Sequence, residues 1–142
     1  MAAKRETDFQ MAIQSTLDEI ESVEKLAEKA AQKMNFNEDE KDSLAIAVTE
    51  AVNNAIIHGN KEDRNKKVAI EFTFEADMLT VTITDEGKGF NPQNLRDPLA
   101  PENLLKENGR GIFILSSLMD DVKYDFDAKG TKLVMRKKKK GT

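Results

Sequence analysis

Hydrophobic and polar residues alternate along five stretches of this chain. Successive side chains of a β-strand point to opposite faces of the sheet, so a period of two predicts a half-buried strand. The stretches are 9–13, 68–74, 79–84, 122–126 and 133–135. Only the short link at 75–78 separates the second stretch from the third, which predicts a hairpin.

Three other stretches place hydrophobic residues three or four positions apart, which is the spacing of an amphipathic helix. They are 16–34, 37–59 and 112–119. The first opens with Thr16 and Glu19, and the second opens with Asn37 and Glu40. Both pairs are spaced like a capping box. Gly59 is the expected C-terminal stop of the second helix.

The order of these elements predicts the fold class. It reads strand, helix, helix, strand, strand, a long interval, helix, strand and strand, with hairpins and no repeated strand–helix–strand unit. We therefore expect an α+β fold, a two-layer sandwich in which helices cover one face of a mixed, mostly antiparallel sheet. The interval 91–108 contains prolines, mixed charge and little periodicity. Loops this long in compact domains commonly carry function.

Composition excludes several classes of protein. The net charge is -4, whereas a protein that binds nucleic acid directly usually has a basic excess. The absence of cysteine excludes disulfides and thiolate metal sites. No apolar run approaches the roughly 20 residues that span a membrane, and the N-terminal residues lack the apolar segment of a signal peptide. We expect a soluble, cytoplasmic protein of one domain. We expect its basic run at 136–140 to be a solvated tail, and the alternative is a weak patch for an anionic partner.

Polar residues with chemical potential interrupt the second predicted helix. Glu50 and Asn54 are four positions apart and therefore share a helix face. An amide oxygen suits Mg²⁺ that phosphate oxygens already hold, because this ion takes only one or two protein ligands. A carboxylate one turn away could orient a hydroxyl or a water for attack on a γ-phosphate. The simpler alternative is a polar helix face with an Asn–Glu hydrogen bond.

A second candidate site follows the third predicted strand. Asp85 ends that strand, and Gly87 and Gly89 follow it in the phrase DEGKGF. A carboxylate at the end of a strand often borders a ligand pocket and could accept a hydrogen bond from the exocyclic amine of adenine. Glycines allow a ligand to approach the backbone closely. The alternative is an ordinary glycine-rich turn.

A third candidate is a glycine pair before the last predicted helix. Gly109, Arg110 and Gly111 precede it, so its N-terminal N–H groups and the arginine could bind phosphate. The alternative is a plain helix start with a surface arginine. Thr131 could donate its hydroxyl to a base or simply lie in a strand turn. For His58, at the end of the second helix, we expect a structural hydrogen bond rather than catalysis.

The three phrases together resemble a known superfamily. EAVNNAIIHGN at 50–60, DEGKGF at 85–90 and NGRGIF at 108–113 occur in the order found in the Bergerat-fold (GHKL) ATP-binding proteins, which include DNA gyrase, histidine kinases and MutL. The chain resembles the bacterial anti-sigma factor serine/threonine kinases more closely, over about 9–135. The resemblance implies one histidine kinase-like ATP-binding domain over 1–142, with an ordered core of about 8–136 and a basic tail at 137–142.

The resemblance also implies a role for each candidate residue. Glu50 would be the general base, Asn54 would bind Mg²⁺, and Asp85 would contact adenine. The pocket would be completed by residues that line it, contact phosphate or lie near the base: Gly87, Gly89, Gly109, Arg110, Gly111 and Thr131. The interval 91–108 would take the place of the ATP lid.

The activity implied by the resemblance is that of a protein serine/threonine kinase. Such a protein would bind Mg·ATP, phosphorylate an anti-sigma factor antagonist and sequester a sigma factor, and we expect a homodimer. His58 is the chain's one histidine and no helical hairpin precedes the domain, so self-phosphorylation on histidine is not expected. We do not expect the transducer domain of gyrase or MutL. The alternatives are a non-catalytic ATP-binding regulatory module that binds partners and an ATPase.

Overall fold

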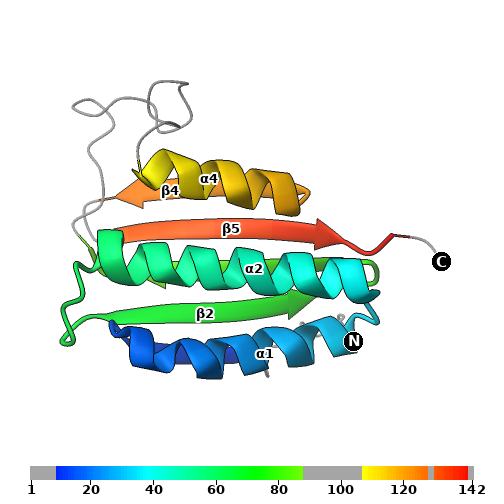
Figure 1. Cartoon of the computed structure of the whole chain (residues 1–142), viewed down its shortest axis with the longest axis horizontal. Coiled ribbons are helices and arrows are strands. Elements are labelled where there is room, and N and C mark those ends of the chain that lie inside the picture. Colours follow the sequence, from blue (N-terminus) through cyan, green and yellow to red (C-terminus); the bar gives the residue numbers. More distant parts are fainter. Residues whose placement is uncertain (1–8, 88–106, 128–129, 141–142) are drawn as a thin grey trace, which may run out of the picture.

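The computed structural model describes residues 9–87, 107–127 and 130–140. Its helices lie together on one side of a five-stranded sheet (Figure 1). The elements are β1 (Gln10–Gln14), the 3₁₀ turn η1 (Leu17–Glu19), α1 (Ile20–Lys33), α2 (Glu38–Asn54), the π turn η2 (Ala55–Gly59), β2 (Lys67–Phe74), β3 (Met78–Asp85), α4 (Glu107–Leu118), β4 (Asp121–Asp127) and β5 (Gly130–Lys138). The predicted two-layer α+β fold is thus confirmed.

The sheet has the strand order β1-β2-β3-β5-β4. The sheet was predicted to be mixed and mostly antiparallel. Each neighbouring pair of described strands is antiparallel, so no parallel pair occurs among them. β3 lies in the middle, and its last residue, Asp85, pairs with Val68 of β2. On the other side of β3, Thr84 pairs with Lys132 of β5. In this register the start of β5 lies beside the end of β3.

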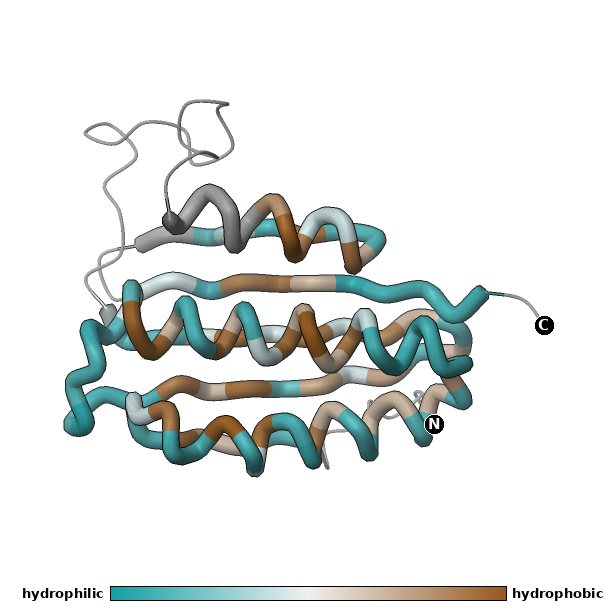
Figure 2. The backbone as a smooth tube through the Cα atoms, in the orientation of Figure 1, coloured by the Kyte–Doolittle hydropathy of each residue, from teal (hydrophilic) through white to brown (hydrophobic). Residues whose placement is uncertain are grey.

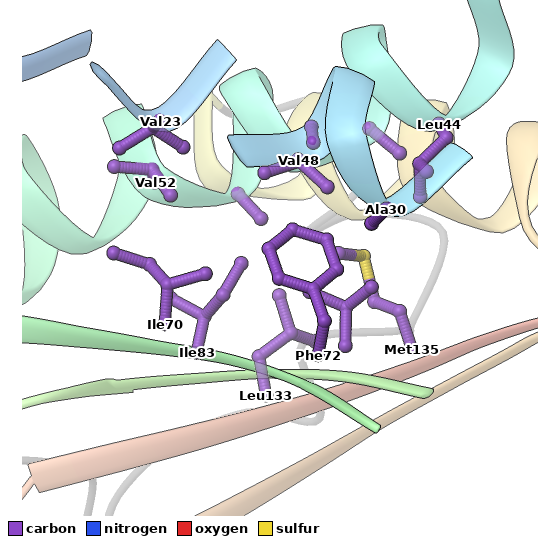
Figure 3. Packing of buried hydrophobic residues seen from close by; sticks show 14 of the residues in the cluster. Val23, Ala30, Leu44, Val48, Val52, Ile70, Phe72, Ile83, Leu133 and Met135 are labelled. Carbon is purple, nitrogen blue, oxygen red and sulfur yellow. The ribbon is translucent and has the colours of Figure 1, made fainter. Parts of the chain in front are cut away.

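The core lies between the helices and one face of the sheet. Figure 3 shows side chains from helices and strands meeting there, and all of them are buried. The labelled residues are Val23, Ala30, Leu44, Val48, Val52, Ile70, Phe72, Ile83, Leu133 and Met135. Full burial of a side chain such as Phe72 contributes about 1.5–3 kcal/mol. The intervening threonines of β3, Thr80, Thr82 and Thr84, are half-exposed on the opposite face.

The hydropathy pattern follows this arrangement. Figure 2 shows hydrophobic residues recurring along α1 and α2, whereas the connection from α2 to β2 is hydrophilic. In α1, the buried positions Val23, Ala27, Ala30 and Ala31 form the stripe predicted for that helix. None of the described helices is long and apolar enough to cross a bilayer.

The two predicted helix caps have different outcomes. The capping box of α2 is confirmed, because the Asn37 N–H donates to Glu40 Oε1 at 2.8 Å and the Glu40 N–H donates to Asn37 Oδ1 at 2.8 Å. Thr16 instead caps η1, where its Oγ1 accepts from the Asp18 N–H at 3.3 Å. α1 therefore begins after a short 3₁₀ turn.

The basic run at the C-terminus extends β5 rather than forming the solvated tail predicted from 136 onward. β5 continues to Lys138, and Lys137 is only 7% exposed. The Lys137 Nζ donates to the backbone carbonyl of Leu118, the last residue of α4, at 3.0 Å. A lysine stem can be buried when its ammonium reaches such an acceptor. The alternation of Leu133 and Met135 simply continues through the lysines.

Glu40 links this C-terminal segment to the start of α2. Although charged, Glu40 is only 4% exposed, and its Oε2 accepts from the Lys140 N–H at 2.8 Å. Burial by itself would raise the pKa of Glu40. The N–H groups of Lys140 and Asn37 oppose that effect, and so do the lysine charges at 137 and 140. Together they bring the pKa of Glu40 below its usual 4.5.

We expect this carboxylate to make stability depend on pH in the acid range. Because the folded-state pKa is the lower one, the stabilisation is complete above about pH 4.5 and is lost as the pH falls through the folded-state pKa. Urea unfolding at a series of pH values should show a steeper acid loss in the wild type than in Glu40→Gln. Parallel curves for the two proteins would show that Glu40 does not contribute.

Candidate functional site

Several chain segments converge at one end of the sheet. Figure 1 places the C-terminal end of α2, the end of β3 and the starts of α4 and β5 at the same end of the molecule. The sequence phrases around Glu50, Asp85 and Gly109 lie on these segments. Residues far apart in the chain are thus brought to one region by the antiparallel register and by the direction of α2.

Asp85 is the buried acidic group of this region. It ends β3 and is 7% exposed. Its Oδ1 accepts from the Gly87 N–H at 3.0 Å and from the Thr131 N–H at 3.1 Å. These bonds fix the carboxylate between its own turn and the start of β5. Oδ2 lies beside Gly59.

Burial dominates the electrostatics of this carboxylate. Loss of water around Asp85 raises its pKa above the usual 3.8, although the N–H groups of Gly87 and Thr131 and the charge of Lys66 act in the opposite direction. Holding this group ionised therefore has a cost in the folded protein. A buried carboxylate is expected to have a partner, and a ligand that donates a hydrogen bond would supply one.

Three glycines enclose Asp85 so tightly that none could carry a side chain without movement. A Cβ on Gly59 would lie 2.5 Å from Asp85 Cγ, and one on Gly87 would lie 2.7 Å from the carbonyl carbon of Gly59. A Cβ on Gly130 would lie 3.0 Å from the carbonyl carbon of Asp85. We call Asp85 and these three glycines the Asp85 cradle. Sequence reasoning had treated Gly59 only as a helix stop.

Gly130 should be the least replaceable residue of the cradle. Its φ of 154° is unfavourable for other residues, and Gly130→Ala also adds the clash with Asp85. We expect Gly130→Ala to lower the free energy of unfolding by at least about 1–3 kcal/mol, the cost of a strained backbone position. Urea unfolding measures this change. Lys132→Ala, at an exposed site of the same strand, is the control, and equal losses in the two variants would contradict the role of the cradle.

The last turn of the helix that begins as α2 is a π turn, which is wider than an α-helical turn and ends at Gly59 of the cradle. After Asn54 the chain forms η2, in which the Asn60 N–H donates to the Ala55 carbonyl, five residues back, at 2.8 Å. Turns of this π type are rare and frequently occur at functional sites. The extra residue brings Gly59 against Asp85. His58 lies half-buried within η2.

Glu50 and Asn54 lie on α2 just before this turn. Both are partly exposed, whereas Ala51 and Val52 between them are buried in the core. The helix therefore presents a carboxylate and an amide at its surface, one turn apart. Within the described ranges, no group of three or more acidic or histidine side chains is placed to hold a metal ion.

Tyr124 is a residue of this region that sequence reasoning missed. It lies on β4 opposite Leu133 and packs against the core. Burial raises the pKa of its phenol, and the negative charges of Glu50 and Asp85 raise it further. Because Coulomb interactions weaken with distance, Tyr124 lies in the neighbourhood of both carboxylates. In the sequence it was only one residue of an alternating strand.

The match with known proteins decides the family. Residues 13–137 fit the model of the histidine kinase-like ATPase domain. The chain belongs to this family. The stated resemblance to ATP-binding proteins of this type is thereby confirmed.

Relatives within the ATPase family refine the comparison. Serine-protein kinase RsbW of Bacillus subtilis is 37% identical over 99 residues, which are 66% of this chain and 62% of the relative. The anti-sigma F factor of Clostridium perfringens is 39% identical over 105 residues, which are 70% of this chain and 74% of the relative. The chain covers 62% and 65% of the RsbW proteins of Bacillus subtilis and Bacillus licheniformis, just under two thirds of their length.

Solved structures of the ATPase family share the fold. The RsbU and RsbW domains of a Mycobacterium tuberculosis protein superpose with a TM-score of 0.69 at 12% identity, covering 96% of this chain and 32% of that one. The catalytic domain of histidine kinase ThkA gives a TM-score of 0.58 at 18% identity, covering 92% of this chain and 97% of that one. At these identities the likeness concerns the fold alone.

The structure brings together only some of the residues predicted for an ATPase-family site. Asp85 and Gly87 lie in the cradle, and Thr131 is bonded to it through its backbone N–H, which donates to Asp85 Oδ1. Glu50 and Asn54 lie on the neighbouring helix. Gly89 and most of the interval 91–108 lie outside the described residues.

The glycine pair near the third helix is placed differently from the prediction. α4 begins at Glu107, so Gly109, Arg110 and Gly111 lie within its first turns instead of before it. The first four N–H groups of a helix have no partner inside the helix. Those of Gly109 and Arg110 belong to that set, whereas Gly111 is the fifth residue. The helix therefore starts five residues before position 112, where it had been predicted to start.

Proposed function

We propose that this protein is an anti-sigma factor serine/threonine kinase. It binds Mg·ATP, transfers the γ-phosphate to a serine or threonine of an anti-sigma factor antagonist, and sequesters a sigma factor. The observation that carries the proposal is the Asp85 cradle at the same end of the sheet as Glu50 and Asn54. One region thus offers a buried acceptor, a carboxylate and an amide.

The cradle suits an adenine base. In the described part of the chain both recorded donors to Asp85 bond to Oδ1, while Oδ2 lies beside Gly59. The 6-amino group of adenine would donate to Oδ2 and give the buried carboxylate a further partner. The glycines allow the backbone to close tightly around Asp85 and would hold its carboxylate in place for the base. Gly89 would extend the same pocket.

The metal and phosphate contacts come from helix residues. The Asn54 side-chain oxygen would be a ligand of Mg²⁺, which suits this ion because it takes few protein ligands. Bound Mg²⁺ would offset negative charge on the phosphate oxygens. The N–H groups of Gly109 and Arg110 in the first turn of α4, with the Arg110 guanidinium, would hold the phosphates by charge-assisted hydrogen bonds. Gly111, which has no side chain, would let the phosphates approach the helix closely.

Glu50 would be the general base. Its carboxylate would accept the proton of the serine or threonine hydroxyl as that oxygen attacks the γ-phosphorus and the bond to the β-phosphate oxygen breaks. The bridging oxygen would remain on the β-phosphate of the departing ADP. Little covalent chemistry is required of the protein, so positioning and electrostatics supply most of the catalysis.

The proposed partners follow from the names of the relatives. Two RsbW relatives are named serine-protein kinases, and the Clostridium perfringens relative is named an anti-sigma F factor. A protein with both properties would bind a sigma factor and an antagonist and would work in the cytoplasm, where transcription takes place. The resemblance to the anti-sigma factor kinases leads us to propose a homodimer as well. It would not contact nucleic acid directly, in line with its net charge of -4.

Two alternatives keep the same site, a non-catalytic ATP-binding module and an ATPase. Saturation with Mg·ATP at about 100 times the dissociation constant should stabilise the protein by roughly 2.7 kcal/mol in all three cases, so a thermal shift tests the site itself. Phosphate released from ATP without any partner would favour the ATPase. Capture of partners from the native host, followed by mass spectrometry, should identify a sigma factor or a small antagonist. Their absence would favour the ATPase, whereas captured partners that are never phosphorylated would favour the non-catalytic module.

A further inference from the structure

Asn60 is a buried polar residue whose side chain bonds three separate chain segments. It is 0% exposed and directly follows Gly59 of the Asp85 cradle. Its Oδ1 accepts from the Glu86 N–H at 2.8 Å. Its Nδ2 donates to Ser15 Oγ at 2.7 Å and to the Lys67 carbonyl at 3.0 Å. These bonds join the ends of β1, η2 and β3 to the start of β2.

The segments are also joined by a second set of bonds. The Glu86 side-chain Oε2 accepts from the Lys67 N–H. Because Asn60 Nδ2 donates to the Lys67 carbonyl, both the N–H and the carbonyl of Lys67 are bonded by these two side chains. Ser15 Oγ donates in turn to the Lys66 carbonyl at 2.7 Å. Ser15 is 1% exposed. A buried network that is fully bonded in this way makes the local structure rigid.

The bond to Glu86 is the one that bears on the site. Glu86 lies between Asp85 and Gly87, and its N–H is the point at which Asn60 holds the turn that follows β3. The same turn presses Gly87 against the Gly59 carbonyl, and Gly59 lies beside Asp85 Oδ2. A shift of the Glu86 peptide would therefore move the carboxylate relative to Gly59.

We propose that Asn60 is a positioning residue that fixes the Asp85–Gly87 turn and thereby sets how well the site distinguishes a purine with a 6-amino group from one with a 6-oxygen. This inference rests on the proposed function, because it takes Asp85 Oδ2 to be the acceptor for adenine. Asn60 itself does not touch the nucleotide. Its effect is on the direction in which the carboxylate points.

Two variants of Asn60 separate positioning from stability. Asn60→Leu has a similar size but no acceptor for the Glu86 N–H, whereas Asn60→Asp keeps an oxygen there and loses the two Nδ2 bonds. Both variants should unfold more easily than the wild type. Ser15→Ala is the matched control, because it removes the two hydrogen bonds of Ser15 Oγ and leaves the Asn60–Glu86 bond in place.

The test is the ratio of affinities for ATP and inosine triphosphate, measured by calorimetry on variants whose folding is verified by circular dichroism. We expect Asn60→Leu to lower this ratio by about tenfold, the equivalent of one hydrogen bond, while Asn60→Asp and Ser15→Ala keep it within about twofold. If Asn60→Leu does not fold, Asn60→Ser, whose hydroxyl is too short to reach Glu86, takes its place.

The outcomes distinguish this inference from the proposed function. If the wild type prefers ATP and the ratio is unchanged in Asn60→Leu, Asn60 has only a structural role and the inference is wrong. If the wild type binds the two nucleotides equally, or binds neither, then the adenine contact of Asp85 is wrong and the inference falls with it. A lower ratio in Ser15→Ala as well would also overturn it, because the effect would then not belong to the Glu86 bond.

Discussion

Replacing Glu50 with alanine is expected to slow phosphoryl transfer about 10²–10⁴-fold, the usual contribution of a positioned general base. The affinity for ATP should hardly change, because Glu50 would act on the hydroxyl of the partner protein rather than on the nucleotide. Glu50 is half-exposed on α2 and does not belong to the core, so the fold should be retained. Initial rates with γ-labelled ATP and calorimetric ATP binding measure the two effects separately.

The control for Glu50→Ala is a second acidic residue of the same helix. Asp42 is exposed on α2, two turns away from Glu50. Asp42→Ala should transfer phosphate at the wild-type rate. Transfer by Glu50→Ala at that same rate would mean that Glu50 is not the base, and an equal loss in both variants would indicate a general effect of removing charge from α2.

Replacing Asp85 with asparagine is expected to weaken ATP binding by about 10–100-fold, the equivalent of one hydrogen bond to a charged group. Asparagine has nearly the same shape, and its oxygen can still accept from the Gly87 and Thr131 N–H groups. Its amide nitrogen would then face the 6-amino group of adenine with a donor instead of an acceptor. The binding-site shape is preserved, but the hydrogen-bond pattern is reversed.

Asp85→Asn should weaken the affinity for ATP without lowering the stability of the folded protein. Burial raises the pKa of Asp85 above 3.8, so the folded protein binds this proton more tightly than the unfolded chain does. The carboxylate therefore costs stability increasingly as the pH rises from about 3.8 through the folded-state pKa, and the cost is fully present at neutral pH. Asp85→Asn removes that cost and should not lower the melting temperature at neutral pH.

Calorimetry for ATP and thermal unfolding without ligand test this pair of effects. Asp77→Asn is the control, since Asp77 is exposed beside the opposite end of β3. Weak binding together with a lower melting temperature would suggest that Asp85 is mainly structural. Wild-type affinity in Asp85→Asn would exclude the proposed adenine contact.

Much of the fold could be predicted because the forces that determine it act over a few residues. Alternation in Val68–Phe74 and Leu79–Thr84, and the helical stripe from Val23 to Ala31, report directly which side chains enter the core. The prediction of a solvated tail was wrong because the positive charge of the basic run was given more weight than the alternation, which continues through it. Lys137 keeps its core-facing position by reaching the Leu118 carbonyl.

The site could be predicted only in part because its geometry depends on contacts between distant segments. Glu50 and Asn54 were identifiable from their spacing on one helix. The importance of Gly59 and Asn60 was not, since it depends on the π turn and on the end of β3. Tyr124 lies on a strand that follows Glu50 by some seventy positions, and only the folded sheet brings its phenol near that carboxylate.

The most direct test of the account is phosphosite mapping on an antagonist protein. The purified chain would be incubated with Mg·ATP and a candidate antagonist, with Glu50→Ala and Asp42→Ala in parallel, and the products analysed by mass spectrometry. We predict phosphate on one serine or threonine of the antagonist with the wild type and Asp42→Ala, and little or none with Glu50→Ala. An antagonist that binds the wild type and remains unmodified, while ATP stays intact or is hydrolysed to free phosphate, would contradict the assignment as a protein kinase.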